Sequence, residues 1–167
     1  MRGHTPADLN EVAALWRDPA VIEHISSTPS TQEESWTRLL RYIGHWHAIG
    51  YGYWVVEDKQ SGTFIGEVGF SDFKRDMVPS LDGQPEAGWA FNVNAWGQGY
   101  AQEAVTCMFH WADVNLTSES TVCIISPEHH ASIRLANKAG FQLQGSRQYR
   151  QDTISLFERI RQNGAQT

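Results

Sequence analysis

The spacing of apolar residues changes along this chain, and the order of the changes constrains the fold more than any other feature. In the N-terminal part, apolar side chains recur every three or four positions, which predicts two helices, over residues 5–18 and 30–50. Thr5 before a proline is a typical helix start, and Ser30 with Glu33 three positions on forms a capping box. After the second helix the pattern changes to short aromatic and β-branched runs.

The rest of the chain alternates between the spacing of strands and that of helices. Runs bounded by turn residues predict six strands, over residues 51–57, 63–70, 86–93, 121–126, 141–149 and 153–159. Helical spacing predicts two further helices, over residues 100–112 and 131–139. Strands and helices in this order form a mixed sheet with helices on its faces, so we expect an α/β (α+β) fold. With 167 residues and no linker or repeat, we expect a single domain over 1–167.

Charge and cysteine content argue against several classes of protein. The net charge of −6 at pH 7 argues against a general nucleic-acid binder, which would show a basic face. Cys107 and Cys123 are too few and too isolated for a disulfide framework. No apolar run approaches the roughly 20 residues of a membrane span, and Met1–Asn10 lacks a signal-peptide stretch. We therefore expect a cytoplasmic protein that binds neither nucleic acid nor membrane.

The histidines do not suggest a metal site. His45 and His47 are two positions apart on an expected helix, so their side chains leave different faces. His129 and His130 are neighbours without a cluster of further ligands. We expect no bound metal.

The segment Phe91–Ala101 combines a strand, a turn containing Gly97 and Gly99, and the start of a helix. A helix N-terminus has unpaired N–H groups and a positive dipole end, which together suit a phosphate. Glycines let the backbone approach the anion because they have no Cβ. The segment matches neither GxGxxG nor a Walker loop, so a dinucleotide or nucleoside triphosphate site is not expected.

This segment resembles the pyrophosphate loop of the GNAT superfamily of N-acetyltransferases, (Q/R)xxGx(G/A). Gly97 and Gly99 fill the glycine positions, and Trp96 to Ala104 is similar to the branch typified by the ribosomal-protein N-terminal acetyltransferases. Asn94 stands at the leading Q/R position, which is a departure from the pattern. The resemblance implies that backbone N–H groups of this loop hold the pyrophosphate of acetyl-CoA. The residues concerned are Gly97, Gln98, Gly99, Tyr100 and Ala101.

A second segment, Pro127–Phe141, is similar to the N-x-A-S-I-R-x-x-x-K-x-G-F pattern of the same branch. The matching residues are Ser132, Ile133, Arg134, Lys138, Gly140 and Phe141. The family uses the Asn to bind the pantetheine arm, and His129 replaces it here with an imidazole that also donates and accepts hydrogen bonds. Arg134 and Lys138 lie four apart on the expected helix, where they either meet cofactor phosphates or form a solvated face.

The resemblance covers roughly Thr5–Arg159 and implies an acetyl-CoA-dependent N-acetyltransferase with a mixed, mostly antiparallel sheet of about six to seven strands. It implies that the sheet opens between the strand ending near residue 93 and the next one. The pantetheine then threads through the opening, held by backbone groups of Phe91, Asn92 and Val93. The family's first strand usually precedes the first helix, and only Met1–His4 remain here, so its edge of the sheet is expected to be short or missing. Dimers are common in the family, which leaves a homodimer open.

Acetyl transfer to an amine needs a proton acceptor for the amine and a proton donor for the thiolate. Glu67 and Glu86 lie on expected strands and are candidate bases, with Glu67 preferred because Glu86 begins its strand. The alternative for each is a surface or salt-bridged carboxylate. The family's tyrosine acid corresponds to Ala136 here, so Ser132 is the nearest substitute, unless it only binds the cofactor.

The acceptor remains open among a protein N-terminus, a free amino acid or polyamine, and an aminoglycoside, although the acidic balance suits a cationic one. The aromatic residues Trp36, Trp46, Tyr51, Tyr53 and Trp54 are expected mainly in the core, with some at an acceptor pocket. A different reading is an acyl-CoA-binding sensor or interaction module without turnover, which the changes at residues 129 and 136 motivate. A third is a purely structural domain that binds no acetyl-CoA.

Overall fold

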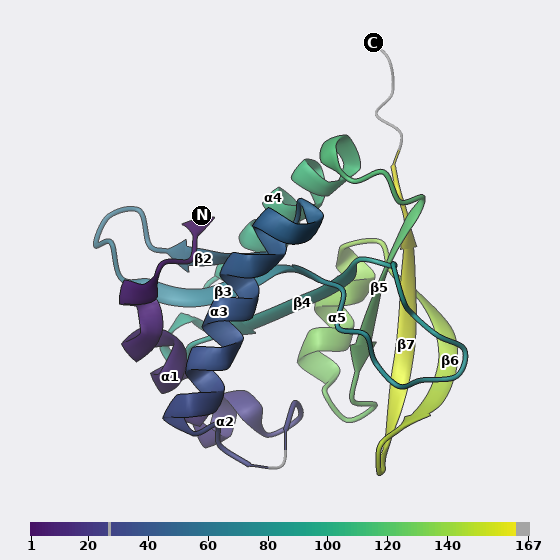
Figure 1. Cartoon of the computed structure of the whole chain (residues 1–167), viewed down its shortest axis with the longest axis horizontal. Helices are drawn as coiled ribbons and strands as arrows, with labels where there is room; N and C mark the ends of the chain where they lie inside the picture. The colour runs from purple at the N-terminus through teal and green to yellow at the C-terminus, as the bar shows by residue number, and fades with distance from the viewer. Residues whose placement is uncertain (27, 163–167) are drawn as a thin grey trace.

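The computed structural model describes residues 1–26 and 28–162, and its strands form one seven-stranded sheet in the order β1-β2-β3-β4-β5-β7-β6 (Figure 1). The strands are β1 (Arg2–Gly3), β2 (Tyr53–Glu57), β3 (Phe64–Ser71), β4 (Glu86–Phe91), β5 (Ser120–Ile125), β6 (Gln142–Tyr149) and β7 (Asp152–Ile160). Neighbouring strands are antiparallel except β4 and β5, which are parallel. The expected mixed, mostly antiparallel sheet is therefore confirmed.

Helices lie on both faces of this sheet, as expected (Figure 1). They are α1 (Leu9–Arg17), α2 (Pro19–Ile22), α3 (Gln32–Ile49), α4 (Tyr100–Asn115) and α5 (His130–Lys138), with short 3-10 turns η1 (Pro6–Asp8) and η2 (Val93–Ala95). Val93 therefore belongs to a turn and not to the strand predicted to include it. Within the described ranges, no helix combines the length and the apolar character needed to cross a membrane.

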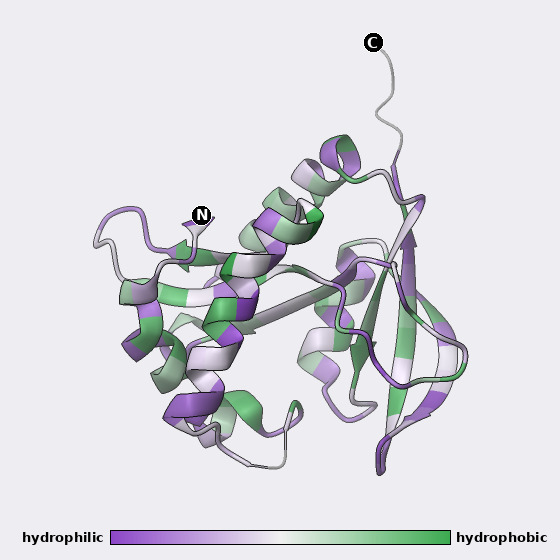
Figure 2. Cartoon of the chain, in the orientation of Figure 1, coloured by the Kyte–Doolittle hydropathy of each residue, from purple (hydrophilic) through white to green (hydrophobic). Residues whose placement is uncertain are grey.

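Two separate cores attach the helices to the sheet. On one face, Leu15 of α1 and Leu39 of α3 pack on sheet residues such as Val55. On the other face, the core joins α4 and α5 to the sheet, with Met108 and Ala136 fully buried. Along α3, hydrophobic and hydrophilic patches alternate, as expected of a helix with one face on a sheet (Figure 2).

The start of α3 lies one residue later than the sequence predicted. The cap is Thr31, whose side chain accepts the Glu34 N–H, while the Glu34 carboxylate accepts the Thr31 N–H at 2.7 Å. Ser30 and Glu33 form the same pattern one position earlier, so the box predicted there is wrong by one residue. The predicted stop at Gly50 is confirmed, since Gly50 closes the helix with φ 79°.

The edge strand β1 is short, as the sequence allowed, but it is present. Arg2 pairs with Val55 of β2 in the antiparallel register. The Arg2 guanidinium also donates to both carboxylate oxygens of Asp8, at 2.7 and 2.8 Å, and to Glu57 at 2.9 Å. These side-chain bonds hold an edge that two residues of backbone pairing would secure only weakly.

The two parallel strands separate soon after they meet. The register between β4 and β5 consists of the single pair Glu86 and Val122, and the ribbons diverge from there (Figure 1). Gly88 and Trp89 are half-buried although they lie in the middle of a central strand. The sheet is therefore open beside β4, as the sequence resemblance implied.

Candidate active site

The glycine turn after β4 leaves the N-terminus of α4 free of side-chain caps. Gly97 and Gly99 have φ values of 72° and 88°, which glycine adopts without strain. Gly99 is the N-cap residue of α4, and no side chain in the described ranges caps the helix there. A Cβ on either glycine would project into open space. The N–H groups of the first helical turn are thus accessible to an anion, and the loop fits a pyrophosphate.

Two side chains of this loop, Gln98 and Tyr100, form hydrogen bonds to other groups of the protein. The Gln98 amide donates to the Asn94 carbonyl, and the Tyr100 hydroxyl donates to the Asp58 carboxylate at 2.8 Å. The first bond lies within the loop, and the second ties the start of α4 to the β2–β3 connection. Because these side chains are already bonded within the protein, the backbone N–H groups of residues 97–101 are what the loop offers to a ligand, and the sequence predicted contacts from these groups.

Two hollows border the glycine turn. One, of about 590 Å³, begins at Gly99 and follows an exposed face of α4 as far as His110. The other, of about 430 Å³, includes Asn92, Gln98 and Tyr100. A ligand bound at the turn would therefore find room to extend along α4 and beside η2.

Alternate residues of β4 direct their backbone groups toward the opening. Asn92 donates its N–H to the Ile65 carbonyl of β3 at 2.9 Å, so every second residue of β4 counted from Asn92 faces β3. Trp89 and Phe91 therefore face β5. The Phe91 carbonyl accepts from Trp96 Nε1 at 2.8 Å, so the Phe91 N–H and the Trp89 backbone are the groups that border the opening.

Of the three residues predicted to offer backbone contacts, Phe91, Asn92 and Val93, only Phe91 borders the opening with a free backbone group. The Asn92 N–H is already bonded to β3, its side-chain amide donates to the Phe64 carbonyl at 3.0 Å, and Val93 begins the turn η2. Trp89 was not singled out from the sequence. The alternation of the strand, counted back from the glycine turn, is the signal that would have found it.

His129 and Ser132 lie together beside the opening. Ser132 Oγ accepts from Trp89 Nε1 at 3.2 Å and lies 3.3 Å from His129 Nε2. The His129 ring packs on His24, with centroids 4.9 Å apart, and burial lowers the pKa of His129. These contacts connect β4 to the start of α5 on the α4 side of the sheet.

The two cations of α5 are placed differently. Lys138 donates to the Gln102 side chain of α4 at 3.1 Å, which brings its charge near the glycine turn. Arg134 is exposed and enters no hydrogen bond or ion pair in the part of the chain that the structure describes. The buried Ala136 offers no proton donor at the family's tyrosine position.

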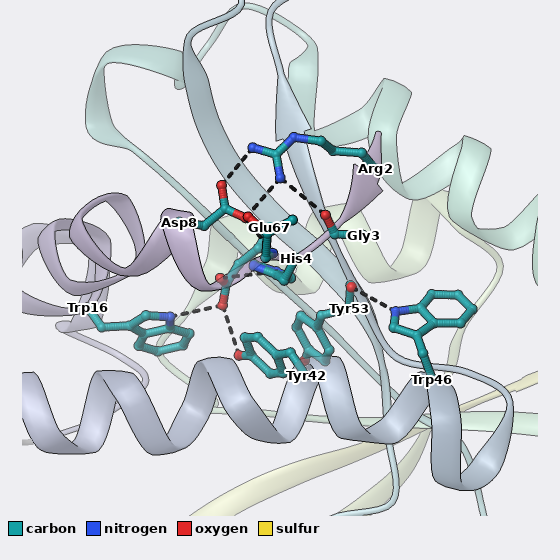
Figure 3. Close-up of polar contacts among 10 residues, drawn as sticks. Arg2, Gly3, His4, Asp8, Trp16, Tyr42, Trp46, Tyr53 and Glu67 are labelled. Atoms are coloured by element: carbon teal, nitrogen blue, oxygen red, sulfur yellow. Dashed lines mark hydrogen bonds and ion pairs between the residues drawn. The ribbon is translucent and has the colours of Figure 1, made fainter.

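Glu67 lies fully buried between the sheet and the helices α1 and α3 (Figure 3). Its Oε1 accepts from Trp16 Nε1 at 2.9 Å and from the Tyr42 hydroxyl at 2.8 Å, while Oε2 lies 3.8 Å from His4 Nε2. Burial raises the pKa of Glu67, and the Tyr42 hydrogen bond opposes the rise. Because its side chain has no exposed surface, a proton from an amine reaches Glu67 only through another group.

Glu86 is the salt-bridged carboxylate that the sequence left open as an alternative. Both of its oxygens accept from Arg75 at 2.7 Å, and only 5% of the residue is exposed. The Arg75 guanidinium also lies over the rings of Phe73 and Tyr149, at 4.5 and 4.9 Å from their centroids. Glu86 thereby fixes the arginine that joins the β3–β4 loop to the β6–β7 hairpin.

The buried His4 should make the free energy of unfolding depend on pH in the acidic range. Both ring nitrogens are buried and have no hydrogen-bond partner among the described residues. Burial lowers the pKa of His4 from 6.5 to about 4, with Arg2 adding to the shift and Asp8 opposing it. Between these two pH values the unfolded chain binds a proton that the folded chain does not. The free energy of unfolding should therefore fall by up to about 3 kcal/mol as the pH drops through this window, at about 1.4 kcal/mol per pH unit.

Urea unfolding at both ends of the window measures this effect. His4→Gln should remove most of the slope, whereas His47→Gln, a change at an exposed histidine of α3, should keep it. Glu67 contributes with the opposite sign in all three proteins, because its raised pKa stabilises the fold as the pH falls. Equal slopes in the wild type and His4→Gln would show that His4 does not titrate in this way.

Comparison with known proteins assigns this arrangement to a family. The family model of the acetyltransferase (GNAT) domain matches residues 1–142. An uncharacterized N-acetyltransferase of Bacillus licheniformis, p20, is 27% identical over 139 residues, which cover 83% of this chain and 75% of that protein. A Bordetella pertussis structure assigned to the GNAT acetyltransferases has a TM-score of 0.83 and 27% identity, and covers 95% of this chain and 93% of its own.

Two further solved structures share the fold and contain ligands. A phosphinothricin acetyltransferase from Sinorhizobium meliloti, in complex with acetyl-CoA, has a TM-score of 0.75 and 23% identity over 99% of this chain and 90% of that one. A spermidine N-acetyltransferase from Vibrio cholerae, in complex with CoA and spermine, has a TM-score of 0.73 and 18% identity over 96% and 94%.

Proposed function

Because the chain belongs to the GNAT acetyltransferase family and is an acetyl-CoA-dependent N-acyltransferase, we propose that it acetylates a primary amine by direct attack of the amine on the thioester. The observation that carries this proposal is the open sheet beside β4 next to an uncapped helix N-terminus. The two features together suit a ligand with a phosphate end and an extended arm.

The cofactor would lie along a continuous path in this proposal. The N–H groups at Gly97 to Ala101 hold the pyrophosphate, with Lys138 nearby. The pantetheine follows the free edge of β4, where the Trp89 backbone and the Phe91 N–H lie, and passes His129 and Ser132. An N–H at this edge polarises the thioester carbonyl and stabilises the oxyanion that forms during attack.

Two proton transfers accompany the attack, one from the amine and one to the leaving thiolate. Ser132 is our candidate donor to the leaving thiolate, because its hydroxyl is held at the opening by Trp89 and His129. Glu67 and Glu86 are the bases that the sequence predicted, but both are buried and hydrogen-bonded, so neither meets the amine directly. Either would have to receive the amine proton through water or another group.

The acceptor is proposed here only as a primary amine, either of a peptide N-terminus or of a small molecule. Spermine in the Vibrio cholerae neighbour supports a small amine, and the resemblance to the ribosomal-protein N-terminal branch supports a peptide. A cytoplasmic location, a single domain over 1–167 and a possible homodimer remain predictions from the sequence.

A screen that couples acetyl-CoA binding to thiol release tests the proposed function. Acetyl-CoA at about 100 times its dissociation constant should stabilise the fold by about 2.7 kcal/mol, and at least one amine, peptide or aminoglycoside should release free thiol. Stabilisation without thiol release on any acceptor would favour the sensor or interaction module. No stabilisation at all would leave only a structural domain.

A further inference from the structure

The Tyr53 ring lies across β3 and β4 at the positions of two glycines, so no side chain of these strands lies beneath it. A Cβ at Gly69 of β3 would overlap the backbone and ring of Tyr53, and a Cβ at Gly88 of β4 would overlap its hydroxyl. Gly69 and Gly88 are directly opposed in the β3–β4 register. The two glycines therefore let the phenol extend from β2 to β4, so that its oxygen lies over the half-buried Gly88 at the opening.

Two stacked tyrosines have hydroxyls in different surroundings. The ring of Tyr42 lies on that of Tyr53, with centroids 4.3 Å apart and planes 8° apart (Figure 3). The Tyr42 hydroxyl donates to the buried Glu67. The Tyr53 carbonyl accepts a hydrogen bond from Trp46 Nε1, but the Tyr53 hydroxyl forms none with the described residues. Only 5% of the residue is exposed. The Tyr53 hydroxyl thus belongs to a largely buried residue, lies at the opening, and has no hydrogen-bond partner among the described residues.

The two faces of the opening differ in what covers them. On the α4 face, Trp89 packs into the core and bonds to Ser132 of α5. On the α3 face, the residue at the corresponding point of β4 is Gly88, and the Tyr53 hydroxyl lies above it. A thioester held by the edge of β4 has its carbonyl in the plane of the sheet, so an amine must attack from one face or the other. At this point of β4 the α4 face carries the Trp89 side chain, whereas the Tyr53 face carries none because the residue there is Gly88.

We propose that the Tyr53 hydroxyl binds the acceptor amine and orients its lone pair toward the thioester carbon. This inference rests on the proposed function. The phenol oxygen accepts a hydrogen bond from the amine N–H, which leaves the nitrogen lone pair free for attack. Burial, with Glu86 and Glu67 nearby, raises the pKa of Tyr53, so the group stays neutral and does not itself remove the amine proton. Tyr53 is therefore an acceptor-binding residue and not a base.

Steady-state kinetics of Tyr53→Phe, with the most active amine of the screen, tests this role. The ring and its stack on Tyr42 are kept, so the variant should fold. We expect the KM for the amine to rise about tenfold, the loss of one hydrogen bond, while acetyl-CoA affinity and the shape of the pH profile stay unchanged. Gly88→Ala, which displaces the hydroxyl, should raise the same KM and serves if Tyr53→Phe is unstable.

Tyr42→Phe is the matched control, since it removes the stacked hydroxyl that bonds to Glu67. It should lower the free energy of unfolding and leave the KM for the amine unchanged. An unchanged KM in Tyr53→Phe, or a lower kcat with a shifted pH profile, overturns the inference. No thiol release by the wild type with any acceptor overturns the proposed function as well, so the two failures are distinguishable.

Discussion

Replacing Gly99 by aspartate is expected to weaken acetyl-CoA binding at least about 100-fold while leaving the protein folded. The Cβ of residue 99 would project into open space at the start of α4, where the pyrophosphate is proposed to lie. A carboxylate there repels two phosphates at short range, and a loss of about 3 kcal/mol corresponds to about 100-fold in affinity. Isothermal titration with acetyl-CoA measures the change.

Gly99→Asn is the control for this substitution. Asparagine has nearly the same shape as aspartate and tolerates the left-handed φ of 88°, but it carries no charge. Its affinity for acetyl-CoA should fall only a few-fold, and both variants should unfold at similar urea concentrations because both residues are good N-caps. Equal losses in the two variants would mean that the phosphates do not lie at this turn.

Glu67→Ala is expected to lower the free energy of unfolding by about 3 kcal/mol. The change leaves the Trp16 indole and the Tyr42 hydroxyl without their shared acceptor in the core and creates a cavity between α1, α3 and the sheet. Urea unfolding at neutral pH measures the loss.

Glu67→Gln separates this anchoring role from the predicted general-base role. The amide oxygen still accepts from Trp16 and Tyr42, so stability should stay within about 1 kcal/mol of the wild type. We expect turnover to be retained within a few-fold, because the side chain has no exposed surface from which to take a proton. A stable Glu67→Gln protein without turnover would instead assign the base to Glu67.

Much of the fold was predictable from the sequence, because the apolar spacing and the glycines act locally. The helices, the strands after residue 50 and the turn at Gly97 and Gly99 follow from such patterns. The cap of α3 was missed by one residue because two overlapping boxes, at residues 30 and 31, satisfy the same rule. The four-residue helix α2 was missed because it is too short to show a period.

The surroundings of the candidate carboxylates were not predictable, because they depend on contacts between distant segments. Glu67 is bonded to residues 51 and 25 positions away, and neither separation leaves a pattern in the sequence. The position of Tyr53 depends on the absence of side chains on β3 and β4. An aromatic residue in a strand usually belongs to the core. Only the β3–β4 register, which places Gly69 opposite Gly88, shows that the Tyr53 side chain can extend toward the opening.

The single register pair between β4 and β5 divides the backbone ladder of the sheet into two leaves, β1–β4 and β5–β7. Few hydrogen bonds resist small shifts of one leaf against the other, so local breathing of the unliganded protein should concentrate along this seam. The extended arm that we propose to lie in the seam would complete the ladder and make the sheet continuous. Rigidity is then greatest while the reactants are bound and smallest once the products have left, which suits a catalyst that must release coenzyme A after each turnover.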